Sequence, residues 1–350
     1  MSKFDQPHIP FLVTRRWLLA GTGSIAAPLL LAIGSQKAHG ADPEFRLKLG
    51  DDLPLDHPLN VHLSEAAKQV AERSGGRLVI ELFANNQLGG DTDMMSQLRS
   101  GALEMMSLSG NILSTLLPLA GIYNLPFAFS NYDQVWATMD GPLGKFLRAK
   151  LEGIGLHALD KQWDNGFRQI TSGTRKIETP SDLQNFKIRV PVSPLWLSMF
   201  KALGAAPTAI NFSEVYSALQ THVVDGQENP LPLIETAKLY EVQKYAALTS
   251  HIWDSFYLLI SKRVWQRLPP DLQAILADTI NQAALAQRRD MQELNSNLQI
   301  KLTQQGMEFT HPDRAAFRQA LIKAGFYAGW KQKYGEDAWN LLQQTSDKLG

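Results

Sequence analysis

The sequence of 350 residues contains no cysteine. The chain therefore forms no disulfide, no thiolate metal site and no cysteine nucleophile. A chain of this length can bury enough apolar surface to fold without covalent cross-links, so the absence of cysteine does not argue against an exported protein.

An excess of charge of either sign is missing too. Lysine plus arginine and aspartate plus glutamate each number 34, and no segment carries a stripe of basic residues. This balance argues against a nucleic-acid partner. Apolar residues make up 44% and charged residues 19% of the chain. These values are typical of a globular protein, and the length suits two domains.

Catalytic and metal-binding motifs are also missing. The sequence has no His-Glu-x-x-His, no P-loop and no Gly-x-Ser-x-Gly elbow, and its eight histidines are scattered. Residues 21–26 match a dinucleotide fingerprint by letters but have no strand before them. Asp91 and Asp93 are spaced as in a calcium loop, but the rest of an EF-hand is absent. We therefore expect no cofactor, no metal and no enzymatic activity.

The N-terminus has the features of an export signal. Lys3, Arg15 and Arg16 form a positive start, residues 17–33 are largely apolar, and small residues precede Ala41. This pattern predicts a signal peptide, residues 1–40, that is cleaved near Ala41. The paired arginines resemble a twin-arginine signal, although Sec signals also contain such pairs, so both export routes stay open. An uncleaved anchor is the weaker alternative, because the apolar run is short for a spanning helix.

The rest of the chain begins with alternating strands and helices. Residues 45–49 alternate apolar and basic side chains, residues 59–73 form an amphipathic pattern, and residues 78–83 predict a second strand. Strand, helix and strand at this spacing predict a parallel pair in an α/β fold. Gln87 and Ser109 follow predicted strands at the ends where such sheets bind ligands, although both also suit ordinary turns.

Four later segments indicate the domain organisation. Residues 122–129 are rich in aromatics and contain a proline, which predicts a sheet edge or a segment that crosses between domains. Residues 133–151 predict one helix, and residues 161–172 a crossing between two domains. Residues 270–305 predict an unusually long helix that braces both domains or, alternatively, makes a coiled-coil contact with a partner.

Residues 186–229 contain the strongest candidate for binding. Arg189 lies in a short apolar strand, where a buried guanidinium needs an anion, either an internal carboxylate or a ligand. Residues 223–225 predict a further strand, so Asn229 would follow its end and converge with Arg189 on one ligand. Because arginine holds its charge near neutral pH without exchanging protons, this set favours capture of a carboxylate over its transformation.

An ordered set of motifs extends from about residue 45 to 340. The motifs are Gln87-Leu88-Gly89, Leu125-Pro126-Phe127, Trp163 to Arg168 followed by Thr171, Lys187-x-Arg189, Phe212-Ser213-Glu214-Val215-Tyr216 and Asp225-Gly226-Gln227-Glu228-Asn229-Pro230. With this set the sequence resembles the periplasmic solute-binding subunits of tripartite ATP-independent periplasmic (TRAP) transporters, DctP type. Each motif alone is weak, whereas their order over this span is specific.

The resemblance implies an α/β fold of two lobes, a periplasmic-binding-protein-like clamshell with a long helix bracing both lobes. Lobe I would comprise residues 41–165 and about 255–294, and lobe II residues 166–254 and about 295–350. The resemblance also implies a periplasmic protein. Such a protein captures an organic acid in the cleft between the lobes and delivers it to the TRAP integral-membrane permease subunits.

The resemblance also implies roles for single residues. Arg189 would form a bidentate salt bridge to the ligand carboxylate, Arg168 would support it, and Asn229 would donate an amide hydrogen bond to the same carboxylate. Phe212 would pack on the body of the ligand. Weaker candidates for contacts that set specificity are Trp163, Gln87, Ser109 and Glu228.

The identity of the acid stays open at this point. Members that resemble sialic-acid binders tend to have an acidic residue at the position of Ser109 and an asparagine at the position of Val192, which argues against sialic acid here. A sugar acid, a short hydroxy or keto acid and an aromatic acid are the alternatives. An ABC-type or sensor-coupled binding protein is the competing function, followed by a periplasmic enzyme that acts on carboxylates.

Overall fold

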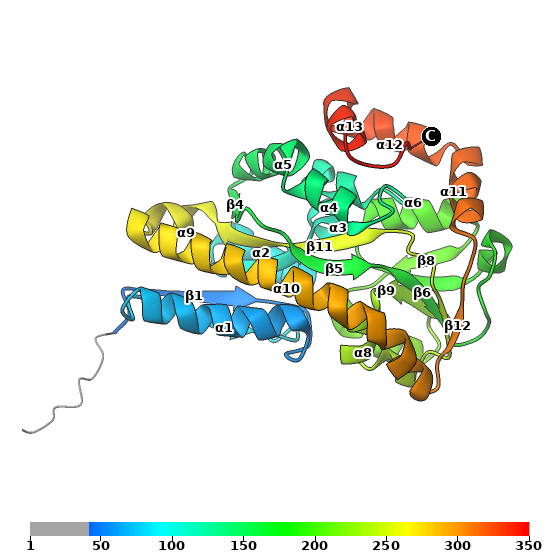
Figure 1. The fold of residues 1–350 in the computed structure, drawn as a ribbon, viewed down its shortest axis with the longest axis horizontal. Helices are drawn as coiled ribbons and strands as arrows, with labels where there is room; N and C mark the ends of the chain where they lie inside the picture. The colour runs from blue at the N-terminus through cyan, green and yellow to red at the C-terminus, as the bar shows by residue number, and fades with distance from the viewer. Residues whose placement is uncertain (1–41, 350) are drawn as a thin grey trace, which may run out of the picture. The chain divides into compact units, whose positions relative to one another are not determined.

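The computed structural model describes residues 42–349, so the predicted signal peptide and its cleavage site lie outside the described residues. Two mixed sheets with helices around them make up this part of the chain (Figure 1). None of the helices within residues 42–349 is both long and apolar enough to cross a membrane.

The first sheet has six strands in the order β2-β1-β3-β11-β4, with β5 paired to β11. Its strands are β1 (Phe45–Gly50), β2 (Leu78–Phe83), β3 (Met105–Ser109), β4 (Leu156–Ala158), β5 (Trp163–Phe167) and β11 (Trp253–Ser261). Strand β1 is parallel to β2 and β3, whereas β11 is antiparallel to β3, β4 and β5. Helix α1 (Pro58–Arg73) connects β1 to β2, which confirms the predicted strand, helix and strand.

Shorter helices follow around the first sheet. They are α2 (Asp91–Ser100), α3 (Gly110–Leu113), the 3-10 helix η1 (Pro118–Asn124), α4 (Tyr132–Met139), α5 (Pro142–Glu152) and α9 (Lys262–Arg267). The prediction of one helix over residues 133–151 is wrong, because the chain breaks at Gly141-Pro142. Pro142 starts α5, and a proline cannot continue a preceding helix.

The prediction for residues 122–129 is also wrong. Residues 118–124 form η1 and the chain then turns, so this segment is neither a sheet edge nor a crossing between domains. Tyr123 is fully buried, and its ring centroid lies 5.6 Å from that of Trp253 and 6.1 Å from that of Tyr257. The aromatic residues fill the space between η1 and β11, which explains their density in the sequence.

The second sheet has six strands in the order β12-β10-β6-β9-β7-β8. Its strands are β6 (Gln169–Ser172), β7 (Lys187–Val190), β8 (Ala206–Ala209), β9 (Gly226–Asn229), β10 (Tyr245–Ala247) and β12 (Glu308–Thr310). The segments around it are η2 (Pro180–Leu183), α6 (Pro194–Ala202), η3 (Phe212–Glu214), α7 (Val215–Gln220), α8 (Leu231–Thr236), η4 (Leu239–Glu241) and α11 (Arg314–Lys323).

The strand predicted at residues 223–225 lies elsewhere. Those residues form a turn in which Val223 is 60% exposed, and the strand is the four buried residues of β9 that follow. A Cβ on Gly226 would lie 2.2 Å from the backbone oxygen of Thr171 on β6. Only glycine fits this close pairing, and glycine is a residue that sequence patterns read as a break in a strand.

Three segments connect the two sheets. Strand β5 ends at Phe167 in the first sheet and β6 begins at Gln169 in the second, which confirms the crossing predicted over residues 161–172. The chain returns between β10 and β11, and there the Arg168 amide donates to the Ile252 carbonyl at 2.8 Å. The two crossings are therefore hydrogen-bonded side by side.

The third connection is α10 (Pro270–Gln304), which confirms the predicted long helix. It packs against α1 and β5 and then continues to α8 and β12 (Figure 1). The last helices, α12 (Phe326–Tyr334) and α13 (Glu336–Gln343), contact η1 on one side, and α12 also contacts α6. They thus touch elements around both sheets, and the lobe boundaries stay a prediction.

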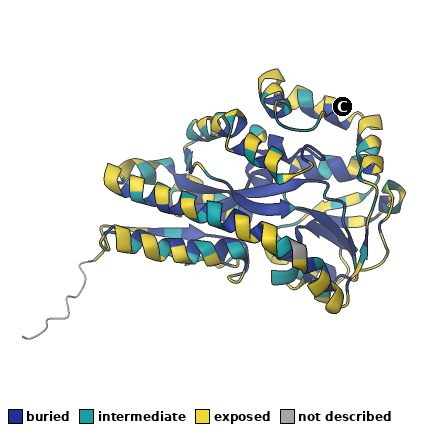
Figure 2. Cartoon of the chain, in the orientation of Figure 1, coloured by how far each residue is buried: buried dark blue, intermediate teal, exposed yellow. Residues whose placement is uncertain are grey.

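The inner strands of both sheets are buried, the edge strand β8 is mostly exposed, and the helices expose one face (Figure 2). Strand β11 is buried along its whole length and lies inside the sheet, with β3 on one edge and β4 and β5 on the other. Polar residues placed at the ends of these strands are therefore shielded from solvent, and this determines the chemistry of the space between the sheets.

Candidate ligand-binding site

A narrow cavity lies between the two sheets, with about 290 Å³ of space among its side chains. Asp52 and Asp91 line it from the first sheet, and Arg189 and Asn229 line it from the second. Only about 20 Å³ of this space is wide enough for the centre of a water molecule, far below the roughly 300–1,000 Å³ of small-molecule pockets, so an organic acid fits only when the two sides move apart.

Arg189 is the cation of this cavity. It lies within β7, between β9 and β8, and is 2% exposed. Its Nε donates to the Ile210 carbonyl at 2.9 Å, and its guanidinium lies 5.8 Å from the centroid of the Phe212 ring. Among residues 42–349, its two terminal nitrogens have no acceptor within hydrogen-bond distance. Burial, together with nearby Arg168, lowers the pKa of Arg189 to about 10. It therefore stays charged near neutral pH.

Arg168 lines the same cavity, but protein groups already hold it. Its Nε and Nη2 donate to the Glu228 carboxylate at 2.6 and 2.8 Å, and Nη2 also donates to the Asn229 Oδ1 at 2.7 Å. Its Nη1 donates to the Asp254 carboxylate at 2.9 Å. The two carboxylates thus compensate the buried charge of Arg168.

Asp254, at the start of β11, joins the two sides of the cavity. Besides Arg168, its carboxylate accepts from the side chains of Ser109 at 2.6 Å, Asn111 at 3.2 Å and Asn165 at 3.1 Å. A further donor is Asn124 at 3.2 Å. Such a carboxylate fixes the orientation of every amide that donates to it, because it can only accept.

Three carboxyl groups gather where the first sheet faces Arg189. Asp51 and Asp52 follow the end of β1, and Asp91 is the first residue of α2. The Asp52 and Asp91 carboxyl groups hydrogen-bond to each other, and the Phe212 amide donates to Asp91. Burial raises the pKa of Asp51 to about 6 and, together with neighbouring Asp51, raises that of Asp91 to about 7. Burial and the charges of Asp91 and Asp51 raise the pKa of Asp52 well above its usual value.

These carboxyl groups do not form a metal site. No group of three or more histidine, cysteine, aspartate or glutamate side chains among the described residues could hold a metal ion. The Asp51 carboxylate is directed away from the cavity. It accepts hydrogen bonds from the Leu53 backbone amide at 2.8 Å, the Asn60 side-chain amide at 2.7 Å and the Ser107 hydroxyl. Asp52 and Asp91 alone of the three line the cavity.

The two sides also meet at the rim of the cavity. The Asn211 amide donates to the Thr92 hydroxyl at 3.1 Å, next to Asp91. A Cβ on Gly90 would lie 3.3 Å from Asn211. This contact brings α2 directly against the segment that carries Phe212.

The structure brings together five of the predicted residues and not the other three. The residues that line the cavity are Arg189, Arg168, Asn229, Phe212 and Ser109. Trp163 packs in the apolar core, Gln87 is exposed in a turn, and Glu228 is buried behind Arg168. The roles of all eight in binding stay predictions.

Sequence reasoning missed Asp52, Asn111, Asn165 and Asp254, and it considered Asp91 only as part of a calcium loop. Asp52 and Asn111 each follow a strand of the first sheet, the same signal that selected Ser109. Asp254 lies inside β11, and nothing in its local sequence indicates that five donors converge on it.

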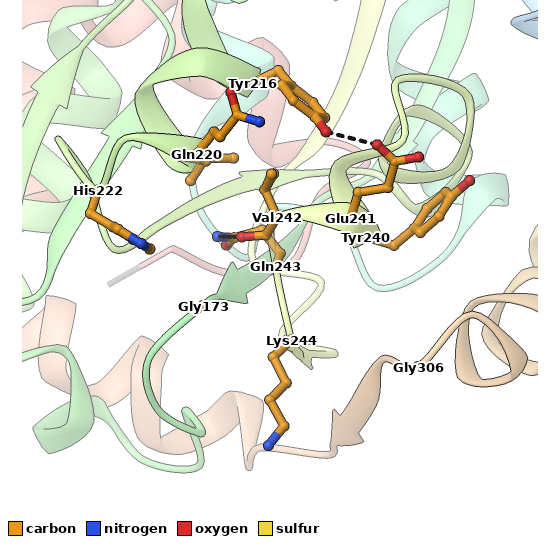
Figure 3. A pocket seen from close by; sticks show the side chains of 11 residues that line it. Gly173, Tyr216, Gln220, His222, Tyr240, Glu241, Val242, Gln243, Lys244 and Gly306 are labelled. Carbon is orange, nitrogen blue, oxygen red and sulfur yellow. Dashed lines mark hydrogen bonds between the residues drawn. The ribbon is translucent and has the colours of Figure 1, made fainter.

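A wider hollow of about 970 Å³, including the solvent at its mouth, lies on the second sheet near α7 and η4 (Figure 3). There the Tyr216 hydroxyl donates to the Glu241 carboxylate at 2.7 Å. Lys244 points away from the other labelled side chains (Figure 3). This hollow holds no buried charge without a partner among the described residues, so the narrow cavity is the better candidate.

Comparison with known proteins identifies the family. Residues 49–325 match the family model described as bacterial extracellular solute-binding protein, family 7, DctP. The chain belongs to this family.

Curated relatives agree with the family model. The chain is similar to the 2,3-diketo-L-gulonate-binding periplasmic protein YiaO of Escherichia coli, with 35% identity over 251 residues, 71% of this chain and 76% of that protein. It is also 36% identical over 313 residues to the uncharacterized protein y4mM of Sinorhizobium fredii. That match covers 88% of this chain and only 56% of the other protein.

Solved structures of DctP-family proteins agree as well. The sugar acid binding protein DctPAm of Advenella mimigardefordensis, in complex with galactonate, has a TM-score of 0.83 at 31% identity, and the match covers 87% of this chain and 98% of that protein. A TRAP periplasmic solute binding protein of Polaromonas with D-erythronate has a TM-score of 0.82 at 30% identity, with coverage of 87% and 100%. A TRAP periplasmic solute binding protein of Sulfurospirillum deleyianum with bound succinate has a TM-score of 0.82 at 29% identity. That match covers 87% of this chain and 99% of the other protein. The predicted two-lobed α/β fold is therefore confirmed.

Proposed function

We propose that this DctP-family protein captures a small organic acid in the cavity between its two sheets and that Arg189 binds the carboxylate. The observation that carries the proposal is a buried guanidinium with two terminal nitrogens that no described residue accepts from. A planar guanidinium presents parallel N–H donors that match the two oxygens of a carboxylate. The related structures with galactonate, erythronate and succinate support a carboxylate as the ligand.

Capture would proceed as the two sides close over the acid. The carboxylate would meet Arg189, and Phe212 would pack against the carbon chain next to it. Asn229 already donates to the Gln227 Oε1 at 2.6 Å and has a second amide hydrogen for the ligand. Once water is excluded, charge-assisted hydrogen bonds become stronger. The crossings near Arg168 and the long helix α10 are the segments about which such closure would occur.

Arg189→Lys tests this function. We expect calorimetry on the purified protein to identify a carboxylate that binds tightly, and Arg189→Lys to weaken it at least about 100-fold, since an ammonium cannot form the paired hydrogen bonds. Lys187→Ala is the matched control, because Lys187 is exposed on the same strand and should keep its affinity. Binding of neutral analogues but of no carboxylate, or full affinity in Arg189→Lys, would contradict the proposal.

The location and the membrane partner form a second part of the proposal. The protein would act in the periplasm and deliver its ligand to TRAP integral-membrane permease subunits. The names of the relatives and of the solved structures support this reading. Genes for a small and a large permease subunit beside this gene are expected. A neighbouring ATP-binding subunit or sensor kinase would favour the alternatives.

A transport role also predicts that the ligand leaves unchanged. The one hydroxyl among the lining residues of the cavity, Ser109, donates to the Asp254 carboxylate, and that carboxylate also accepts from Arg168 and three asparagines, an arrangement that orients amides rather than activating a nucleophile. After incubation with the protein, the acid should be recovered intact by mass spectrometry, whereas turnover would indicate an enzyme.

A further inference from the structure

The cavity wall holds several buried acceptor atoms without partners. The amide oxygens Asn111 Oδ1 and Asn165 Oδ1 are buried and have no hydrogen-bond partner among the described residues, and the buried carboxyl oxygens Asp52 Oδ1 and Asp91 Oδ2 have no donor apart from the bond between these two carboxyl groups. All four residues line the cavity with Arg189. A buried acceptor left without a donor costs free energy, so the two amide oxygens beside this carboxyl pair indicate a ligand that supplies donors.

The two asparagines present oxygen for a structural reason. Asn111 and Asn165 both donate their Nδ2 groups to the Asp254 carboxylate, at 3.2 and 3.1 Å. Because a carboxylate accepts and cannot donate, these amides cannot turn around, and each is left with its oxygen free. Asn111 also donates to the Ser109 hydroxyl at 2.5 Å, which holds it in the same orientation.

The wall is therefore chemically divided. The second sheet offers one cation, Arg189, and the first sheet offers mainly acceptors, headed by Asp52 and Asp91. A complementary molecule carries one carboxylate and, along the rest of its chain, hydroxyl groups that donate hydrogen bonds.

From this division we propose that the ligand is a polyhydroxylated monocarboxylate, an acid of the aldonate type, and that Asp52 is a specificity-determining residue that accepts from its hydroxyl groups. The inference rests on the proposed function and narrows its ligand class. A dicarboxylate of the same length would place its second carboxylate against Asp52 and Asp91, where both repulsion and the loss of donors disfavour it. An aromatic acid would leave the amide oxygens of Asn111 and Asn165 without donors.

Erythronate and succinate provide a matched pair for the test. Both have four carbons. Erythronate carries one carboxylate and three hydroxyls, whereas succinate carries two carboxylates and no hydroxyl. We expect calorimetry at pH 7 to show that the wild-type protein prefers erythronate over succinate by at least about 100-fold, since a site built to bond hydroxyls rejects analogues without them. Galactonate and gulonate extend the series to six carbons, and benzoate represents the aromatic acids.

Asp52→Asn tests the residue. It keeps the shape of the side chain but replaces one acceptor oxygen with a donor, so the preference for erythronate over succinate should fall at least about 10-fold. Asp56→Asn is the control, because Asp56 is exposed in the same loop and its loss should leave the preference unchanged. Thermal unfolding of each variant without ligand checks that the fold is retained.

The outcomes separate this inference from the proposed function. If succinate or benzoate binds as well as the hydroxy acids and requires Arg189, the inference is wrong while carboxylate capture stands. The same holds if Asp52→Asn leaves the preference unchanged. If no acid of the series binds and Arg189→Lys has no effect on any ligand, both are wrong. Selective, Arg189-dependent binding of hydroxy acids that Asp52→Asn relaxes supports both.

Discussion

Glu228 holds Arg168 through two hydrogen bonds, from Nε to Oε2 at 2.6 Å and from Nη2 to Oε1 at 2.8 Å, with both side chains buried. Burial alone would raise the pKa of Glu228, but Arg168 and a hydrogen bond from His251 lower it to about 2. The pair therefore stays ionised over the whole physiological range. Arg168 is therefore a structural residue of the cavity wall, and Arg189 is the arginine whose terminal N–H groups are available to a ligand.

Arg168→Lys should consequently destabilise the fold. An ammonium cannot bond Glu228, Asp254 and Asn229 together, so buried carboxylates lose part of their compensation, at a cost of about 3 kcal/mol in the free energy of unfolding. Urea denaturation measures this value. Arg189→Lys, which disturbs one hydrogen bond to a carbonyl, should change the same quantity by less than about 1 kcal/mol. Equal losses in the two variants would show that the arginines do not divide these roles.

Asp164 should make stability depend on pH. It is fully buried, and burial raises its pKa to about 7 in spite of a hydrogen bond from Trp253 at 2.8 Å. A carboxyl group whose folded pKa exceeds its unfolded value stabilises the protein at low pH, and this contribution is lost as pH rises from about 4 through 7. Asp164→Asn should therefore gain stability relative to wild type between pH 5 and pH 8, by about 1 kcal/mol or more.

Thermal unfolding at both pH values checks this prediction. Buried His57 has the opposite dependence, because burial lowers its pKa to about 3, so its contribution to stability is lost as pH falls below its unfolded value. Since the substitution leaves His57 unchanged, the comparison between variant and wild type isolates Asp164. A difference that stays constant with pH would count against a protonated Asp164.

Gly226 and Gly329 should respond to alanine in opposite directions. A Cβ at Gly226 would lie 2.2 Å from the Thr171 oxygen and 2.6 Å from the Phe186 ring, so Gly226→Ala should cost at least about 2 kcal/mol. At Gly329, inside α12, a Cβ meets nothing within 4 Å, so Gly329→Ala should stabilise by about 0.5–1 kcal/mol. The urea denaturation midpoints of the two variants, compared with wild type, measure these changes in stability. A Gly226→Ala variant as stable as wild type would contradict the tight pairing of β9 with β6.

Ligand binding should weaken as pH rises through 7. Asp91, whose pKa burial raises to about 7, faces Arg189, and its ionised form competes with the ligand carboxylate for that charge. The charged or titratable groups around it are Asp51, Asp52, Arg189, Glu228 and Arg168. Because the ligand favours protonated Asp91, affinity at pH 8 should be up to about 10-fold lower than at pH 6.

Calorimetry in buffers of different ionisation enthalpy measures both the affinity and the proton taken up. Asp91→Asn should flatten the dependence, since an amide does not titrate in this range and can still accept from the Phe212 amide. Affinity that rises between pH 6 and pH 8 would reverse the sign and exclude Asp91 as the responsible group.

The sequence by itself determined the α/β order of the first elements, the long helix, the crossing at residues 161–172 and the burial of Arg189. These features depend on local periodicity, on the absence of helix breakers and on an arginine among apolar neighbours, all of which can be read over short windows. The family resemblance, which rests on the order of motifs, was likewise available from the sequence.

Only the tertiary structure decided which arginine is free. Arg168 and Glu228 are 60 residues apart, and they meet because β6 pairs antiparallel with β9, with Ile170 opposite Glu228. The same holds for Asp52, Asp91 and the asparagines around Asp254, whose unpartnered oxygens arise from contacts between distant strands. Hydrogen-bond partnership is set by sheet register and packing, so a local pattern can show that a charged residue is buried but not what it binds.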